Sequence, residues 1–249
     1  MEKGPSDWTA VVTGASRGLG KAIASAFARQ GANVALLCRR ESEEAHEVAG
    51  RIEKEGRTAW VWQCDVADSK AVRRTIEDVV RQAGSIEVLV NNAGVSHSSL
   101  LLKTDEATWD EVLSTNLTGA FNCTRAVLRF MVPQRRGHIV NVGSLSGMRG
   151  AAGSAAYCAS KAGLIGLTLA TAREYARHNI AVNAILPGYM PTAMGKAMAS
   201  ASRKRILSEN LLGRGSTPEE TAAFIVRLVQ MEGISGQIFN LDSRPWRWA

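Results

Sequence analysis

Tyr157 and Lys161, four residues apart in the chain, are the two side chains whose types and spacing best suit acid–base chemistry. Four residues are about one helical turn, so on a helix the phenol and the ammonium would share one face. A phenol with its usual pKa of ~10 donates a proton poorly at neutral pH. A cation held about 5 Å away, at an effective dielectric constant of ~20, favours the phenolate by roughly 3 kcal/mol, or about two pKa units. The pair therefore indicates a general acid–base centre, although a Tyr/Lys pair on a solvated helix surface would have no such role.

A glycine-rich turn near the start of the chain could hold a dinucleotide beside this centre. Glycines at 14, 18 and 20 follow a predicted strand and open a predicted helix. Glycine permits tight turning and lets backbone N–H groups approach a pyrophosphate at the positive end of the helix. We expect the residues of the turn to line the cofactor site: Gly14, Ser16, Arg17, Gly18, Leu19 and Gly20.

The residues after the second predicted strand should distinguish NADH from NADPH. A carboxylate there would bind the ribose 2′-hydroxyl and repel a 2′-phosphate. The chain instead has Arg39 and Arg40, with the first carboxylate at Glu41, and Arg17 adds a cation inside the glycine turn. Guanidinium groups match phosphate geometry, so these arginines favour NADPH/NADP+ as the cofactor. The alternative is that Arg39 and Arg40 only begin a solvated helix.

Short β-rich runs alternate with longer amphipathic segments, which is typical of parallel βαβ units. The predicted strands are apolar runs at 8–13, 33–38, 58–64, 86–91, 137–143, 180–186 and 236–240. The predicted helices cover 18–30, 41–55, 69–83, 105–132, 155–177 and 218–231, and Gly31, Gly56 and Gly84 follow three of them as C-terminal caps. We therefore expect an α/β fold over residues 1–249, a single doubly wound domain with a seven-stranded parallel sheet and helices on both faces.

The segment 188–217 contains no predicted strand and lies between the last two strands. Its Met-, Ala-, Ser- and Gly-rich composition suits a mobile lid over a pocket at the carboxyl ends of the strands. Met190, Met194 and Met198 recur every four residues and would share one face if the segment is helical. Such a face suits an aliphatic substrate, although ordinary packing against the sheet explains it equally well.

The composition is that of an ordinary globular protein with a positive charge. The chain has 249 residues, of which 45% are hydrophobic and 21% charged, and a formal net charge of +7. The basic residues are scattered and form no nucleic-acid motif. No apolar run approaches the ~18 residues of a membrane span, and residues 1–7 show no signal peptide. The cysteines and histidines lack paired or metal-type spacing, so we expect free thiols, no metal site, no membrane or nucleic-acid partner and a cytoplasmic location.

Together these residues resemble the short-chain dehydrogenase/reductase family over nearly the whole chain. The matching motifs are Thr13-Gly14-x3-Gly18-x-Gly20, Asn91-Asn92-Ala93-Gly94, Asn116, Ser144, Tyr157-x3-Lys161 and Pro187-Gly188-x3-Thr192. The resemblance implies a Rossmann-type fold and a catalytic set. Tyr157 would donate a proton to a carbonyl oxygen, and Ser144 would hydrogen-bond that oxygen. Lys161 would lower the pKa of Tyr157 and bind the nicotinamide ribose, and Asn116 would hold a water that links Lys161 to solvent.

The same resemblance implies further contacts on both halves of the cofactor. Asp65 would hydrogen-bond the adenine. The adenosine side would be lined by Asp65, Val66, Asn91, Ala93 and Gly94. The nicotinamide side would be held by Pro187, Gly188, Met190 and Thr192. Taken one by one, residues such as Ser144 and Asn91 could instead serve as caps or turns.

Within this family the chain looks most like β-ketoacyl-acyl-carrier-protein reductases. Those enzymes reduce a 3-oxoacyl thioester with NADPH, usually as tetramers, which implies an acyl-carrier-protein or CoA substrate and a homotetramer here. Arg129 and Arg173 lie where such reductases use basic residues to dock the acidic carrier protein. The helices over 116–128 and 157–175 would pack across a subunit interface.

Two departures leave the substrate open. Residues 239–244 differ from the ending of many relatives, and the tail after them carries Trp246 and Trp248. A dehydrogenase of another alcohol, sugar or xenobiotic ketone is therefore the alternative, because such enzymes use the same machinery. A non-catalytic NADPH-sensing or scaffold protein is a more distant alternative, and it predicts a broken catalytic set.

Overall fold

Seven parallel strands form one sheet in the computed structural model, which describes residues 8–198 and 200–244. Their order is β3-β2-β1-β4-β5-β6-β7, as expected for a doubly wound Rossmann-type fold. The strands are β1 (Thr9–Thr13), β2 (Asn33–Cys38), β3 (Ala59–Gln63), β4 (Val88–Asn91), β5 (Gly137–Val142), β6 (Ile180–Leu186) and β7 (Ile238–Asn240). All seven lie within the predicted ranges. The tail residues Trp246 and Trp248 lie outside the described residues.

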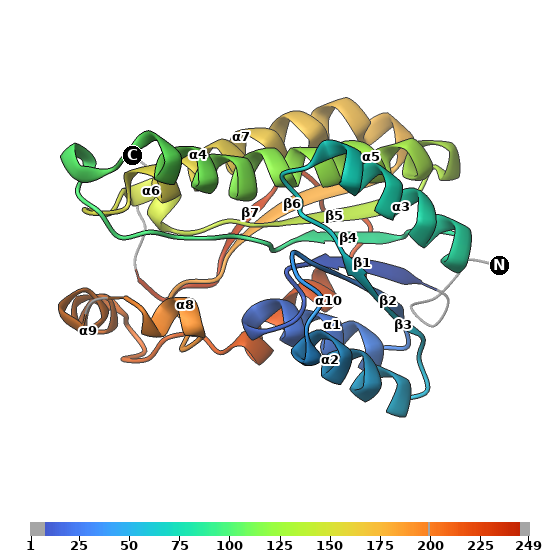
Figure 1. Ribbon diagram of the computed structural model, residues 1–249, viewed down its shortest axis with the longest axis horizontal. Coiled ribbons are helices and arrows are strands. Elements are labelled where there is room, and N and C mark those ends of the chain that lie inside the picture. Colours follow the sequence, from blue (N-terminus) through green and yellow to red (C-terminus); the bar gives the residue numbers. More distant parts are fainter. Residues whose placement is uncertain (1–7, 199, 245–249) are drawn as a thin grey trace.

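Helices cover both faces of this sheet (Figure 1). One face carries α1 (Gly18–Arg29), α2 (Glu43–Lys54) and α10 (Pro218–Leu228). The other carries α3 (Ser69–Ala83), α4 (Glu106–Leu113), α5 (Gly119–Gln134) and α7 (Ala155–Tyr175). Successive strand side chains point to opposite faces, so Ala10 and Val12 pack in the first layer and Val11 in the second. The predicted α/β fold with helices on both faces is confirmed.

Local capping signals fix where several of these helices begin and end. Gly31, Gly56 and Gly84 follow α1, α2 and α3 with φ of 95°, 77° and 83°, in the left-handed region that glycine tolerates. Asp68 and Thr217 accept backbone N–H groups at the starts of α3 and α10. The predicted ends of these helices therefore agree with the structure to within a few residues.

The predicted helix over 105–132 is present but is not α-helical throughout. α4 ends at Leu113, a π-helical turn covers Ser114–Thr118, and α5 begins at Gly119. A Cβ atom at Gly119 would lie 2.5 Å from Cγ2 of Val66, so the glycine lets α5 approach the loop after β3. Such single π turns interrupt α-helices and are frequent at functional sites. This one carries Asn116, whose exposed fraction is only 1%.

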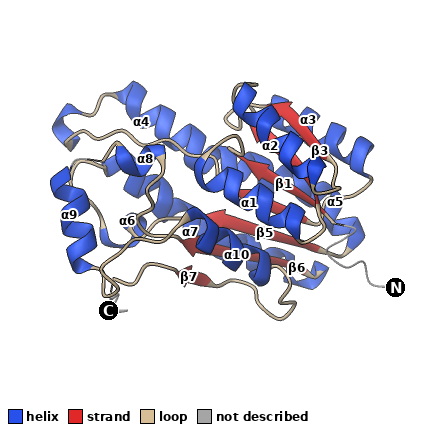
Figure 2. Cartoon of the chain, turned by 90° about the horizontal axis from the view of Figure 1, so that it is seen from below, coloured by secondary structure: helices blue, strands red, loops and turns tan. Residues whose placement is uncertain are grey.

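The segment 188–217, between β6 and α10, is helical in part and contains no strand among its described residues. It contains α8 (Ala193–Lys196) and α9 (Ser200–Glu209), and the short α6 (Ser146–Arg149) follows β5. Figure 2 shows α8 and α9 with α4 and α6 at one end of the molecule. None of the helices in the described part of the chain has the length and apolar character needed to cross a bilayer.

The three methionines of this segment do not share one face, contrary to the prediction. Only Met194 belongs to α8, because that helix covers four residues. Met190 lies before it and packs against the core beneath α10, where its sulfur accepts a hydrogen bond from Thr221. Met194 and Met198 are 45% and 36% exposed. Packing therefore accounts for Met190, and two methionines remain at the surface.

Candidate active site

The glycine turn lies where the strand order reverses, because β1 pairs with both β2 and β4. Ligands of doubly wound sheets bind in the crevice at this place. Gly14 and Gly18 have φ of 64° and 55°, and a Cβ atom at Gly20 would lie 2.2 Å from the carbonyl oxygen of Gly14. α1 then begins with exposed Arg17 at its N-cap and no acidic residue in its first turn. The turn therefore needs its glycines and fits an anionic pyrophosphate.

Two residues that hold this turn had no predicted role. The side-chain amide of Asn92 donates to the carbonyl oxygens of Thr13 and Gly14, at 2.9 and 3.2 Å. The hydroxyl of Thr13 accepts the N–H groups of Asn92 and Ala93, at 3.0 and 2.9 Å. Both residues stand in the motifs quoted above, but only the pairing of β1 with β4 reveals what they do.

The end of β2 is basic, as predicted from the sequence. Arg39 and Arg40 are exposed directly after Cys38. The nearest carboxylate in the chain, Glu41, pairs with His46 at 2.8 Å. Arg39 itself contacts a distant carboxylate, because its Nη1 lies 3.5 Å from Oε1 of Glu111 in α4. The residues of this strand end fit a phosphate better than a ribose hydroxyl.

On the adenosine side, the loop after β3 is fixed from α5. Asp65 is exposed, and one oxygen of its carboxylate accepts the N–H of Ala67 at 2.9 Å. The amide of Asn122 donates to the carbonyl oxygens of Val66 and Ala67, at 2.9 and 3.4 Å. The second carboxylate oxygen of Asp65 can still accept a hydrogen bond. No motif in the sequence pointed to Asn122, which lies 56 residues after Val66.

Asn91 uses its side chain inside the protein. Its amide donates to Oδ1 of Asn141 at 2.8 Å and to the hydroxyl of Thr124 at 3.0 Å, and the residue is 4% exposed. Asn141 in turn donates to Thr168 of α7 at 2.9 Å. The Nδ2 of Asn91 is therefore occupied by protein groups and is not available to a cofactor. The predicted contacts of Ala93 and Gly94 are backbone contacts, and both residues are half-buried.

The four predicted catalytic residues come together at the carboxyl end of β5. A hydrogen bond joins the hydroxyl groups of Ser144 and Tyr157. Nζ of Lys161 lies 5.8 Å from the centre of the Tyr157 ring and donates to the carbonyl oxygen of Val142 at 2.6 Å. A Cβ atom at Gly94 would lie 3.3 Å from Oδ1 of Asn116 and 3.8 Å from Nζ of Lys161. Tyr157 and Lys161 thus share one face of α7, as their spacing indicates.

The side chain of Asn116 is occupied by protein groups. Its Oδ1 accepts the N–H of Val95 at 2.8 Å, and its Nδ2 donates to the carbonyl oxygen of Val95 at 2.9 Å and to Ser160 at 3.1 Å. Ser160, a residue without a predicted role, also donates to the carbonyl oxygen of Tyr157 at 2.8 Å. Asn116 therefore joins the loop after β4 to the start of α7. A water bound by Asn116 stays a prediction.

Burial opposes the predicted lowering of the Tyr157 pKa by Lys161. Burial raises the pKa of Tyr157, and the hydrogen bond from Ser144 only partly opposes this shift. Burial also lowers the pKa of Lys161 to about 8. The charged form of each group is thus disfavoured by the same apolar surroundings. In this protein Tyr157 keeps its proton well above neutral pH.

The predicted nicotinamide side lies after β6 and next to the glycine turn. Gly188, after Pro187, has a φ of 75°, and a Cβ atom there would lie 2.7 Å from Oδ2 of Asp242. Thr192 caps α8 by accepting the N–H of Gly195 at 3.3 Å, so its own hydroxyl proton remains available to a ligand. A Cβ atom at Gly18 would lie 3.5 Å from the methyl group of Thr192. The carbonyl oxygen of Met190 accepts the N–H of Thr192.

Comparisons with known proteins agree with this geometry. Residues 8–203 match the short chain dehydrogenase family. The chain is 39% identical over 236 residues to the 3-oxoacyl-[acyl-carrier-protein] reductase FabG of Staphylococcus aureus, covering 94% of this chain and 96% of the relative. It is 38% identical to the FabG reductase of Thermotoga maritima over 246 residues, covering 93% and 95% of the two chains.

Solved structures share the fold over nearly its full length. A crystal structure of a Sinorhizobium meliloti protein, assigned as a short-chain alcohol dehydrogenase, has a TM-score of 0.90 and 39% identity over 95% of both chains. The structure of NAD+-bound xylitol dehydrogenase has a TM-score of 0.89 and 30% identity, covering 95% of this chain and 98% of that one.

Proposed function

The chain belongs to the short chain dehydrogenase family and is an oxidoreductase acting on CH–OH and C=O groups, and from this premise we propose that it reduces a 3-oxoacyl thioester with NADPH. The observation that carries the chemistry is the hydrogen bond between the hydroxyl groups of Ser144 and Tyr157 at the end of β5. Two hydroxyl groups at hydrogen-bonding distance from each other can both donate hydrogen bonds to one carbonyl oxygen. The identity to 3-oxoacyl-[acyl-carrier-protein] reductases supports the choice of substrate.

The chain's own residues supply the proton and stabilise the developing charge. A nicotinamide cofactor held at the glycine turn would supply the hydride to the carbonyl carbon. The phenol of Tyr157 gives its proton to the carbonyl oxygen, and its raised pKa keeps that proton in place at neutral pH. Ser144 donates a hydrogen bond to the same oxygen as charge develops on it. Lys161 stabilises the phenolate that remains, and Asn116 supports the path by which solvent returns the proton.

NADPH is proposed as the cofactor because of the charges around its expected 2′-phosphate. Arg39 and Arg40 are exposed after β2, and Arg17 is exposed at the start of α1. Guanidinium groups bind phosphate through charge-assisted, often bidentate hydrogen bonds. Asp65 would bind the adenine with its remaining carboxylate oxygen, and Thr192 would donate its hydroxyl proton to the carboxamide.

An acyl carrier protein is proposed as the carrier of the substrate. Arg129 of α5 and Arg173 of α7 are both exposed on the same helical layer, where they can attract an acidic partner.

The segment 188–217 would act as a lid on the substrate. The protein would act in the cytoplasm as one domain and as a homotetramer joined through α5 and α7. Phe121 of α5, 43% exposed beneath the guanidinium of Arg125, supports such an interface.

A second candidate is an NAD(P)-dependent dehydrogenase of another alcohol or sugar. The similarity to NAD+-bound xylitol dehydrogenase supports it, because that protein shares the fold at 30% identity. The catalytic residues would act in the same way in both cases. The two candidates differ only in cofactor and substrate.

Oxidation of NADPH and NADH with acetoacetyl-CoA, beside xylulose and a panel of simple ketones, tests the proposal. We expect turnover of the thioester with a clear preference for NADPH. Turnover of xylulose with NADH alone would favour the second candidate.

Carrier-protein docking is tested with Arg129→Glu, which should raise KM for an acyl-carrier-protein substrate and leave KM for acetoacetyl-CoA unchanged. Equal KM values for wild type and variant would contradict docking at Arg129.

A further inference from the structure

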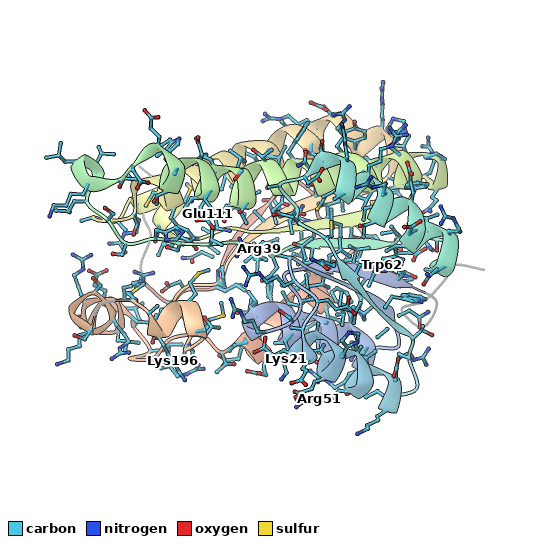
Figure 3. The ribbon with its side chains drawn as sticks, viewed as in Figure 1. Lys21, Arg39, Arg51, Trp62, Glu111 and Lys196 are labelled. Carbon is cyan, nitrogen blue, oxygen red and sulfur yellow. The ribbon has the colours of Figure 1, made fainter. Side chains whose placement is uncertain are left out.

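A single carboxylate, that of Glu111 in α4, contacts both Arg39 after β2 and His97 in the loop after β4. Its Oε1 lies 3.5 Å from Nη1 of Arg39, and its Oε2 lies 2.9 Å from Nε2 of His97. The three side chains are 52%, 42% and 45% exposed for Arg39, Glu111 and His97. Figure 3 shows Arg39 and Glu111 between the two helical layers. Neither the sequence motifs nor the proposed mechanism uses Glu111.

The contact with Arg39 is loose enough for another anion to replace it. A tight ion pair has an N⁺–H···O⁻ distance of about 2.7–2.9 Å, and the guanidinium offers five N–H donors. Glu111 engages one nitrogen of Arg39 at 3.5 Å. A phosphate can therefore bind the remaining donors of Arg39 or displace the carboxylate. In both cases the negative charge of Glu111 stays near that phosphate and repels it, because α4 holds the backbone of Glu111 in place.

The contact with His97 lies on the other side of the carboxylate. His97 follows Val95 by two residues, and Val95 is the backbone partner of the catalytic Asn116. The loop that carries His97 also borders α7 through the bridge between Ser99 and Ser154, three residues before Tyr157. Glu111 thus joins Arg39 to the loop beside the catalytic residues.

We propose that Glu111 determines cofactor specificity by weakening the hold of Arg39 on the 2′-phosphate. This inference rests on the proposed NADPH preference and adds a residue that opposes it. The carboxylate competes for the guanidinium when the cofactor is absent and repels the phosphate when it is present. NADH has no 2′-phosphate, so its affinity is independent of this competition. Glu111 therefore reduces the difference in affinity between NADPH and NADH.

Direct titration of the full-length protein with NADPH and NADH, followed by cofactor fluorescence, tests this role. Glu111→Gln keeps the size of the side chain and removes its charge. We expect the Kd for NADPH to fall about two- to fivefold, the range for an exposed ion pair, and the Kd for NADH to stay unchanged. Asp110→Asn is the matched control. It removes the same charge one position earlier from an exposed residue of α4, and it should not change the ratio of the two Kd values.

A double-mutant cycle with Arg39→Ala separates a local effect from a change in overall charge. In the Arg39→Ala background, Glu111→Gln should no longer tighten NADPH binding, because the residue for which it competes is gone. The inference would be overturned if Glu111→Gln increased NADPH affinity by the same factor in the Arg39→Ala background as in the wild type. It would also be overturned if Glu111→Gln increased the affinity for NADH by the same factor as that for NADPH. A wild-type preference for NADPH that Glu111→Gln leaves unchanged would overturn it as well. Equal binding of both cofactors by the wild-type protein would instead overturn the proposed NADPH preference, and this inference with it.

Discussion

The side-chain amide of Asn116 pairs with both backbone polar groups of Val95, as a neighbouring strand would. Oδ1 accepts the Val95 N–H at 2.8 Å, and Nδ2 donates to the Val95 carbonyl oxygen at 2.9 Å. The π-helical turn at Ser114–Thr118 carries Asn116 to this position. Because each end of the amide has a matching partner, only asparagine satisfies both groups of Val95.

Asn116→Asp should therefore lower both the stability and the activity of the protein, although it replaces only one non-hydrogen atom of the side chain. An oxygen would replace the Nδ2 donor and face the carbonyl oxygen of Val95. Loss of such a buried hydrogen bond costs about 1–3 kcal/mol, so we expect a Tm lower by several degrees and at least a tenfold loss of kcat/KM. Asn33→Asp is the control, since Asn33 uses only its oxygen, which accepts the Thr58 N–H at 3.0 Å. Similar Tm values for both variants would show that the paired amide is unimportant.

Tyr157→Phe should remove turnover and spare cofactor binding. The change deletes the hydroxyl that meets Ser144 and leaves the ring in place. General acid catalysis contributes about 10²- to 10⁴-fold, so kcat should fall by that factor while the Kd for NADPH stays within about twofold. Tyr175→Phe, at the opposite end of α7, serves as the control and should keep wild-type kcat. Retention of a tenth or more of wild-type kcat by Tyr157→Phe would exclude the phenol as proton donor.

The pH dependence of reduction should report Lys161. Burial lowers the pKa of Lys161 to about 8, so the ammonium is present below that pH and is lost as the pH rises through it. If the ammonium stabilises the Tyr157 phenolate, kcat/KM should fall by about tenfold per pH unit above 8. Lys161→Arg keeps a cation throughout this range. For this variant, the decrease of kcat/KM at alkaline pH should begin at a higher pH than in the wild type, even if its maximal kcat/KM is lower. If the decrease begins at the same pH in both proteins, the titrating group is not Lys161.

Stability at acidic pH should depend on His138, which lies at the start of β5, away from the predicted catalytic residues beyond the other end of that strand. Its ring stacks on Trp8 with centroids 5.8 Å apart, and burial, aided by the charge of Arg136, lowers the pKa of His138 to about 4. An unfolded histidine titrates at ~6.5, so the unfolded state binds more protons between these values. The free energy of unfolding should therefore decrease as pH falls from about 6.5 to 4.

Urea unfolding at several pH values measures this contribution. His138→Gln should remove a slope of up to about one proton from the pH dependence of unfolding in that window. Identical slopes for wild type and His138→Gln would show that His138 is already free to charge in the folded protein.

The sheet and the main site residues could be predicted because their signals are local. Buried parallel strands are apolar throughout, as in Val34 to Leu37, and glycines such as Gly84 mark helix ends through their positive φ. The positions of the predicted catalytic residues also follow from local signals. Tyr157 and Lys161 meet through helical spacing alone, and Ser144 lies just beyond the end of β5.

The remaining features depend on contacts between distant segments. Nothing within residues 105–132 marks the π turn, which directly precedes Gly119, where α5 approaches Val66. Adjacent asparagines also look alike in the sequence. Asn91 faces Asn141 and Asn92 faces the glycine turn, because successive residues of a strand point to opposite sides. The pairing of Arg39 with Glu111 spans 72 residues and has no local signal.

The buried contact between Asn91 and Asn141 has a consequence for how the sheet assembles. The two residues stand opposite each other in the β4–β5 register. The apolar side chains of these strands, such as Val88 and Val90, would pack almost as well if β4 were displaced by two residues. Such a displacement would break the buried hydrogen bond between the two side-chain amides, which is costly because both residues are buried. The asparagine pair thus favours the native β4–β5 register over a register shifted by two residues.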